Sequence, residues 1–225
     1  MTLSDVLGAV AAGHPPEPDG SVAVLPQQGL AAAVVAFSAH FLVCADVDPD
    51  WVNEVLPAGD YSAPHGARFL TTLADRIGSD IGALDVVLVR QADDASGPGL
   101  DLEEIDTLDH PRVVRALRYR EDVRVSRTPD HAGHLLVGRG LAGRWEMAFE
   151  VEPGARGTGR RARAAPCRRS AQLVPAGELA WAQVSPGHPA SLRAVLAAGY
   201  RPVCAEVLLP SRRRGGATRG QIGPG

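Results

Sequence analysis

The spacing of hydrophobic residues shifts along the chain between a period of two, typical of strands, and a period near 3.6, typical of helices. Alternating or wholly apolar runs predict strands at residues 84–90, 122–126, 134–141, 144–151, 178–184 and 203–209. Helical spacing predicts helices at residues 4–12, 67–77, 110–119 and 190–198, with a further helix beginning near Asp48. Residues 31–46 are apolar enough for one buried strand or a strand pair, and the proline-rich residues 13–29 should form a loop.

Composition sets broad limits on what this chain is. Its 225 residues, 45% of them hydrophobic, suffice for one large or two small globular domains. No apolar run approaches the roughly 18 residues of a membrane span, and the first residues lack the pattern of a signal peptide, so we expect a cytoplasmic protein. The formal net charge of -3 gives no footprint for nucleic acid or an anionic membrane, so neither is expected as a partner. All 23 basic residues are arginine, which we interpret as the mark of a GC-rich genome and which lowers the functional weight of arginine clusters.

Metal binding is not expected. Cys44, Cys167 and Cys204 lie far apart without C-x-x-C spacing, which suggests neither a disulfide framework nor a zinc site. His131 and His134 flank a predicted turn and lack a third ligand.

A glycine-rich turn at residues 152–160 follows the alternating strand 144–151 and enters a predicted helix. Glycines let backbone N–H groups crowd an anion, and a helix N-terminus adds partial positive charge. The turn is therefore a candidate phosphate cradle, although glycines also close ordinary surface loops.

Two motifs, in this order, resemble those of the GNAT superfamily of N-acetyltransferases. The first is Val151-x-Pro153-x-x-Arg156-Gly157-x-Gly159, and the second begins at Ser185-Pro186-Gly187-His188 and ends near Gly199-Tyr200. The resemblance implies an α/β (α+β) fold, a mixed and mostly antiparallel twisted sheet flanked by helices. It covers a domain at residues 83–210, with an N-terminal α/β extension at 1–82 and a disordered Arg/Gly tail at 211–225. The extension could add strands to the same sheet or be a degenerate companion half.

The implied activity is transfer of an acetyl group from acetyl-CoA to a primary amine of a small molecule or protein, directly within a ternary complex, by a monomer or homodimer. By the same resemblance, Phe149 and Val151 would offer main-chain hydrogen bonds to the cofactor, and His188 and Ser191 belong to the second motif. The turn residues assigned to the coenzyme A pyrophosphate are Arg156, Gly157, Thr158, Gly159 and Arg160.

The chain departs from the GNAT pattern at three positions. Arg161 replaces a small residue of the turn, where it could crowd the phosphate or compensate by its charge, and Pro166 interrupts the helix behind it. Val195 stands where many members have a tyrosine that protonates the leaving thiolate; Tyr200 is a candidate substitute or a core aromatic. These departures leave a second interpretation open, a degenerate acyl-CoA-binding or interaction module. We also hypothesise that residues 160–172 and 211–225 were read out of frame relative to an ancestral gene.

Acetyl transfer to an amine needs a base for the amine proton and donors for the developing oxyanion. Strand N–H groups near Ala148 and Phe149 are candidate donors. Glu146 and Glu150, on the acidic face of the strand, are candidate bases if burial and like-charged neighbours raise the pKa. The alternative is that these glutamates pair with arginines or face solvent.

Overall fold

The computed structural model describes residues 1–91, 102–105, 111–128, 133–151, 167, 173–175 and 177–212. Ten strands form one sheet in the order β1-β3-β2-β10-β4-β9-β8-β7-β6-β5. The strands are β1 (Val22–Leu25), β2 (Ala31–Phe37), β3 (His40–Cys44), β4 (Leu84–Gln91), β5 (Glu103–Glu104), β6 (Glu121–Arg127), β7 (Gly133–Arg139), β8 (Trp145–Val151), β9 (Leu179–Val184) and β10 (Arg201–Pro210). The helices are α1 (Leu3–Ala11), α2 (Pro49–Val55), α3 (Ala67–Ile77), α4 (Pro111–Ala116) and α6 (Pro189–Ala197), with short 3-10 turns η1 (Ala63–His65) and η3 (Leu141–Gly143).

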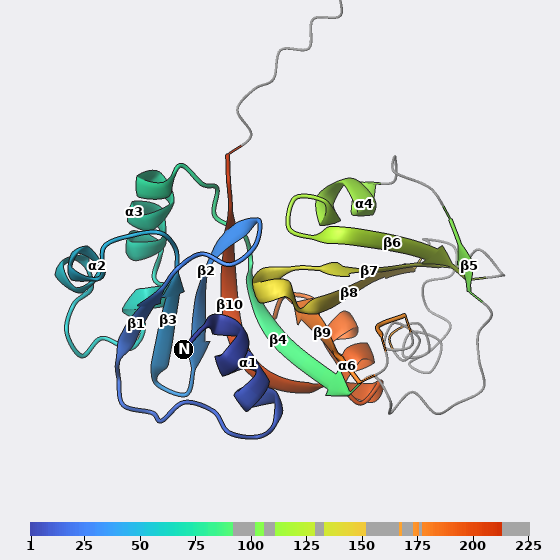
Figure 1. Ribbon diagram of the computed structural model, residues 1–225, viewed down its shortest axis with the longest axis horizontal. Helices are drawn as coiled ribbons and strands as arrows, with labels where there is room; N and C mark the ends of the chain where they lie inside the picture. The colour runs from blue at the N-terminus through green and yellow to red at the C-terminus, as the bar shows by residue number, and fades with distance from the viewer. Residues whose placement is uncertain are drawn as a thin grey trace, which may run out of the picture.

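The predicted mixed, mostly antiparallel sheet flanked by helices is confirmed (Figure 1). Among the described pairings only β1–β3 and β8–β9 are parallel. Strand β10 pairs with β2 on one side and β4 on the other, so residues 1–82 extend the same sheet rather than building a separate one. Residues 31–46 form the strand pair β2–β3. The expected loop at 13–29 is wrong in part, because residues 22–25 form the edge strand β1.

Helix boundaries follow local chemistry. Thr2 caps α1 by accepting a hydrogen bond from the Asp5 N–H, while the Asp5 carboxylate accepts one from the Thr2 N–H. Asp48 caps α2 with Pro49 in its first turn, as the sequence predicts. Helix α3 ends at Gly78, whose φ of 65° is the left-handed conformation that glycine adopts without strain.

Hydrophobic cores lie on both faces of the sheet. On one face, α1 and η3 pack over β2, β4 and β9, and α4 packs over β6 and β7. On the other face, α3 and α2 cover β2, β3 and β10, and α6 covers β4, β8 and β9. Because side chains alternate along a strand, the even-numbered residues Glu146 and Ala148 of β8 face α4, and Trp145 and Met147 face α6.

Candidate active site

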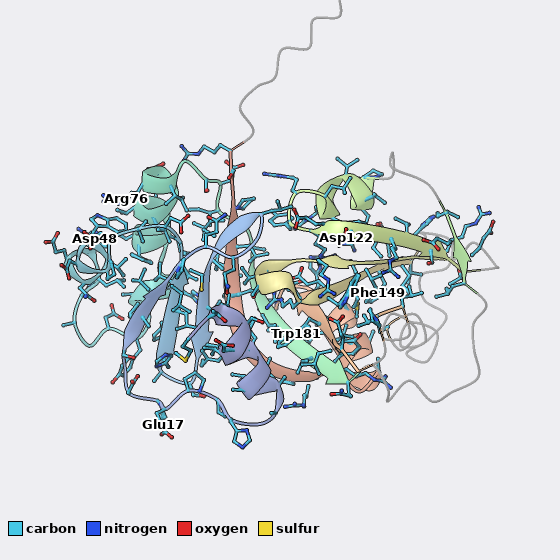
Figure 2. The ribbon with its side chains drawn as sticks, in the orientation of Figure 1. Glu17, Asp48, Arg76, Asp122, Phe149 and Trp181 are labelled. Carbon is cyan, nitrogen blue, oxygen red and sulfur yellow. The ribbon has the colours of Figure 1, made fainter. Side chains whose placement is uncertain are left out.

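The parallel strands β8 and β9 pair over only three residues each, Trp145–Met147 with 180–182. Beyond Met147, β8 continues to Val151 and pairs with β7 alone. The two strands draw apart in Figure 1, and Figure 2 labels Phe149 on β8 and Trp181 on β9. In the described part of the chain, no strand pairs with this edge of β8 after Met147.

Part of that edge is already engaged by Arg112 of α4. Its guanidinium donates to the Phe149 carbonyl at 3.0 Å, and its Nε lies 3.4 Å from a Glu150 carboxylate oxygen. The carbonyl that the sequence assigns to a cofactor therefore has a hydrogen bond from the protein, for which a cofactor would compete. Val151 lies at the end of β8, opposite Gly133 of β7.

A pocket of about 120 Å³ lies where α4 faces β4, β8 and β9. Its wall includes Asp85 of β4, Glu146 of β8 and Gln183 of β9. Helix α4 and the turn after it contribute three arginines to the same wall, Arg112, Arg115 and Arg120. The pocket thus adjoins the point where β8 and β9 separate.

Glu146 is part of a closed set of hydrogen bonds that we call the charge ring, formed by Arg120, Arg144, Glu146, Gln183 and Glu206. Glu146 accepts from Arg120 and from Arg144, both at 2.8 Å. Arg144 also donates to Glu206 at 2.5 Å. Gln183 closes the ring by donating to Glu206 at 3.1 Å and accepting from Arg120 at 3.0 Å. The ring therefore ties β8, β9 and β10 together.

The expectation that Glu146 has a raised pKa is wrong. Burial alone would raise it, since the side chain is 0% exposed, but the guanidiniums of Arg144 and Arg120 lower the pKa below its ordinary value. A carboxylate held ionised by two cations is a poor proton acceptor. Glu150, half-buried beside Arg112, also follows the alternative that the glutamates pair with arginines.

Asp85 has the opposite electrostatics. Burial, with smaller contributions from the negative charges of Glu206 and Glu146, raises the pKa of this carboxyl to about 6, and Arg115 and His188 counteract the rise only in part. Glu206 is its direct neighbour across the β4–β10 pairing. In the described ranges, no hydrogen bond or ion pair joins the Asp85 side chain to another group. Asp85 is the functional candidate that the motifs missed; its signal in the sequence is a lone carboxylate within the apolar strand 84–89.

No protein-family model matches the chain, and none of the curated proteins matches it. Among solved structures, a GCN5-related N-acetyltransferase from Kribbella flavida shares 17% identity at a TM-score of 0.42, with 63% of each chain covered. An acetyltransferase of the GNAT family from Colwellia psychrerythraea shares 10% identity at a TM-score of 0.39, over 63% of this chain and 61% of that one. A functionally unknown conserved protein from Staphylococcus epidermidis shares 12% identity at a TM-score of 0.36, with 66% of its length covered. The chain thus spans less than two thirds of the length of each of these three proteins.

The second of the two motifs that resemble GNAT sequences begins just before α6 and ends after it. His188 is exposed at the N-cap without a side-chain capping bond, and Ser191 is half-buried in the first turn. Val195 is 0% exposed and packs in the core under β8 and β9. Tyr200, only 2% exposed, belongs to the same core, which favours its packing role over the role of an acid in the pocket.

The glycine turn itself, including Arg156, Gly157, Thr158, Gly159, Arg160 and Arg161, lies outside the described residues, as do Pro166 and residues 213–225. Cys167, the next residue after Pro166, is described; its side chain is fully buried in the core that α6 covers. Within the described ranges, no group of three His, Cys, Asp or Glu side chains is placed to hold a metal ion. None of the helices described is long and apolar enough to cross a membrane.

Proposed function

We propose that this chain transfers an acetyl group from acetyl-CoA to a primary amine, with Asp85 as the base. The observation that carries the proposal is Asp85 itself, a carboxylate with a pKa of about 6 and no hydrogen bond or ion pair to a described residue, in a pocket beside the separated strands β8 and β9. A general base works best when its pKa lies near the working pH, and most surface carboxylates are too acidic for that. The motifs that resemble GNAT sequences and the separation of β8 from β9 after Met147 support the assignment of the donor.

The residues of the chain would divide the work as follows. The edge of β8 after Met147 would align the donor, and acetyl-CoA, when bound, supplies an activated thioester. The amine enters the pocket between α4 and β4, where its nitrogen bonds to the acetyl carbon, and the carbon–sulfur bond breaks with release of CoA as the thiolate, which takes up a proton from water. Asp85 accepts the proton that the nitrogen loses, directly or through one water. Main-chain N–H groups of β8 near Ala148 and Phe149 remain the candidate donors to the carbonyl oxygen.

The test is release of free CoA from acetyl-CoA across a panel of primary amines, with the wild type and Asp85→Asn. Removal of a general base is expected to lower kcat/KM by about 10²- to 10⁴-fold. Asp75→Asn is the matched control, because Asp75 lies on the surface in an exposed pair with Arg212. Equal activity of wild type and Asp85→Asn would remove Asp85 as the base.

The second candidate function, a module that binds acyl-CoA weakly or not at all, is favoured by Arg112. This side chain already bonds the Phe149 carbonyl, and Val195 provides no phenol at the position of the GNAT tyrosine. Calorimetric titration with acetyl-CoA separates the two functions. Binding followed by turnover supports the enzyme; a folded protein that shows neither heat nor a thermal shift with acetyl-CoA excludes it.

A further inference from the structure

The arginines that line the pocket are not equivalent. Arg120 is committed to Glu146 and Gln183 in the charge ring. Arg112 is committed to Glu150 and the Phe149 carbonyl. Arg115, between them in sequence, has no hydrogen bond or ion pair to any described residue, but its positive charge offsets part of the rise in the Asp85 pKa.

Among the described residues, the pocket therefore presents one cation and one anion that have no hydrogen bond or ion pair, while the other charges of its wall are paired. Arg115 on α4 and Asp85 on β4 line the same cavity but are not bonded to each other. A ligand that carries a positive and a negative group would satisfy both residues at once. An amine whose molecule carries no anionic group would contact Asp85 but would offer no acceptor to the Arg115 guanidinium.

The size of the pocket limits the ligand further. Its volume is about 120 Å³. An apolar cavity of about 150 Å³ accommodates benzene, a ring of six carbon atoms. The pocket is therefore suited to a ligand, or the head of a ligand, of similar size, such as an amine and a carboxylate separated by one or two carbon atoms.

From this arrangement we propose that the pocket binds a small amino acid, with its ammonium at Asp85 and its carboxylate at Arg115. The guanidinium forms a charge-assisted, planar contact with the carboxylate, which fixes the amine end against Asp85. This inference rests on the proposed function, because it makes the amino acid the acetyl acceptor. It narrows that function from primary amines in general to acceptors with an anionic group close to the amine.

Direct binding tests the inference without turnover. Glycine, β-alanine and glycinamide, in which an uncharged amide replaces the carboxylate, would be titrated calorimetrically into the wild type, Arg115→Gln and Arg118→Gln. Arg118 is the matched control: it lies next to the same helix but pairs with Asp80 outside the pocket. We expect the better of the two amino acids to bind about 10- to 100-fold more tightly than glycinamide, and Arg115→Gln to remove that difference, as expected for loss of a charged hydrogen bond. Arg118→Gln should retain it.

A second measurement separates failure of the inference from failure of the proposed function. The same three ligands would be offered with acetyl-CoA and scored for CoA release. Amino-acid binding that depends on Arg115 but yields no CoA keeps the binding site and removes the enzyme. CoA release with glycinamide as good as with the amino acids, or amino-acid binding unchanged by Arg115→Gln, overturns the carboxylate site and leaves the acetyltransferase intact.

Discussion

Glu146 and Asp85 are two carboxylates on the same face of the sheet, in the wall of one pocket, with opposite electrostatics. Glu146 is fully buried and held by two guanidiniums, and its pKa is lowered. Asp85 is less buried and unpaired, and its pKa is raised to about 6. Burial acts in the same direction on both, so the number of cations in direct contact decides between them. The charge ring thus stabilises the fold, whereas Asp85 and Arg115, which are not bonded to each other, are the groups to which we assign a ligand.

Breaking the charge ring should have the largest effect on stability. Arg144→Met would leave Glu146 and Glu206, both 0% exposed, without the cation they share. Removing one partner of a buried ion pair costs about 3–5 kcal/mol because the remaining charge stays buried. Urea denaturation followed by circular dichroism would measure this loss in the free energy of unfolding.

The matched control is Glu178→Gln, which breaks the bidentate but half-exposed pair with Arg139. Exposed pairs contribute less than about 1 kcal/mol, so this variant should stay close to the wild type. If Arg144→Met were no more destabilising than Glu178→Gln, the ring would not be the structural element described above.

Gly140 tests the same ring through packing, with a smaller expected effect. A Cβ at this position would lie 2.2 Å from the Glu146 carboxyl carbon. The Glu146 carboxylate cannot easily move away, because it accepts hydrogen bonds from Arg120, Arg144 and the Leu141 N–H. Gly140→Ala should therefore destabilise the fold by about 1–3 kcal/mol, as overpacking does. Gly8→Ala is its control, because an added Cβ in α1 meets nothing within 4 Å and should be neutral or slightly stabilising. Equal stability of the two variants would mean that Glu146 moves aside at little cost.

Much of the fold could be predicted because most strands are buried on at least one face of the sheet. Such strands show alternating hydrophobic and polar residues, or a continuous apolar run, in the sequence. β1 was missed because its four residues are all only half-buried and show no alternation. The order of the strands was not predictable in the N-terminal part, since the position of β10 between β2 and β4 depends on pairing between residues more than 100 positions apart.

For the site, the sequence predicted the acidic face of β8 but not its partners. Arg120 is 26 residues from Glu146, and Arg144 reaches Glu206 across 62 residues. No local pattern shows that these side chains meet, so a raised pKa was expected where the pKa is lowered. Asp85 has no motif at all, and only the fold brings Arg115 and Glu206 to it.

The smallest expected effect is on the pH dependence of the free energy of unfolding, which should differ between the wild type and Asp85→Asn. Asp85 has a folded pKa of about 6 against an ordinary value of 3.8, so between these pH values the unfolded chain releases a proton that the folded protein keeps. Its stabilising contribution is thus complete below about pH 4 and lost as the pH rises to about 6. The charges that act on it are Glu206 of β10, Glu146 of β8, Arg115 of α4 and His188 before α6, and all of them remain in Asp85→Asn.

The wild type should therefore lose stability relative to Asp85→Asn between about pH 4 and 6, with a constant difference above that range. Glu146 has the opposite effect: its pKa is lowered, so it stabilises the fold at pH values above its ordinary pKa, and this stabilisation is lost on acidification. Both proteins contain Glu146, so its contribution cancels in the difference between them. Parallel urea titrations at pH 4, 5, 6 and 8 would measure the two curves. A difference that does not change with pH would show that the pKa of Asp85 is not raised, and the electrostatic distinction between Glu146 and Asp85 would then fail.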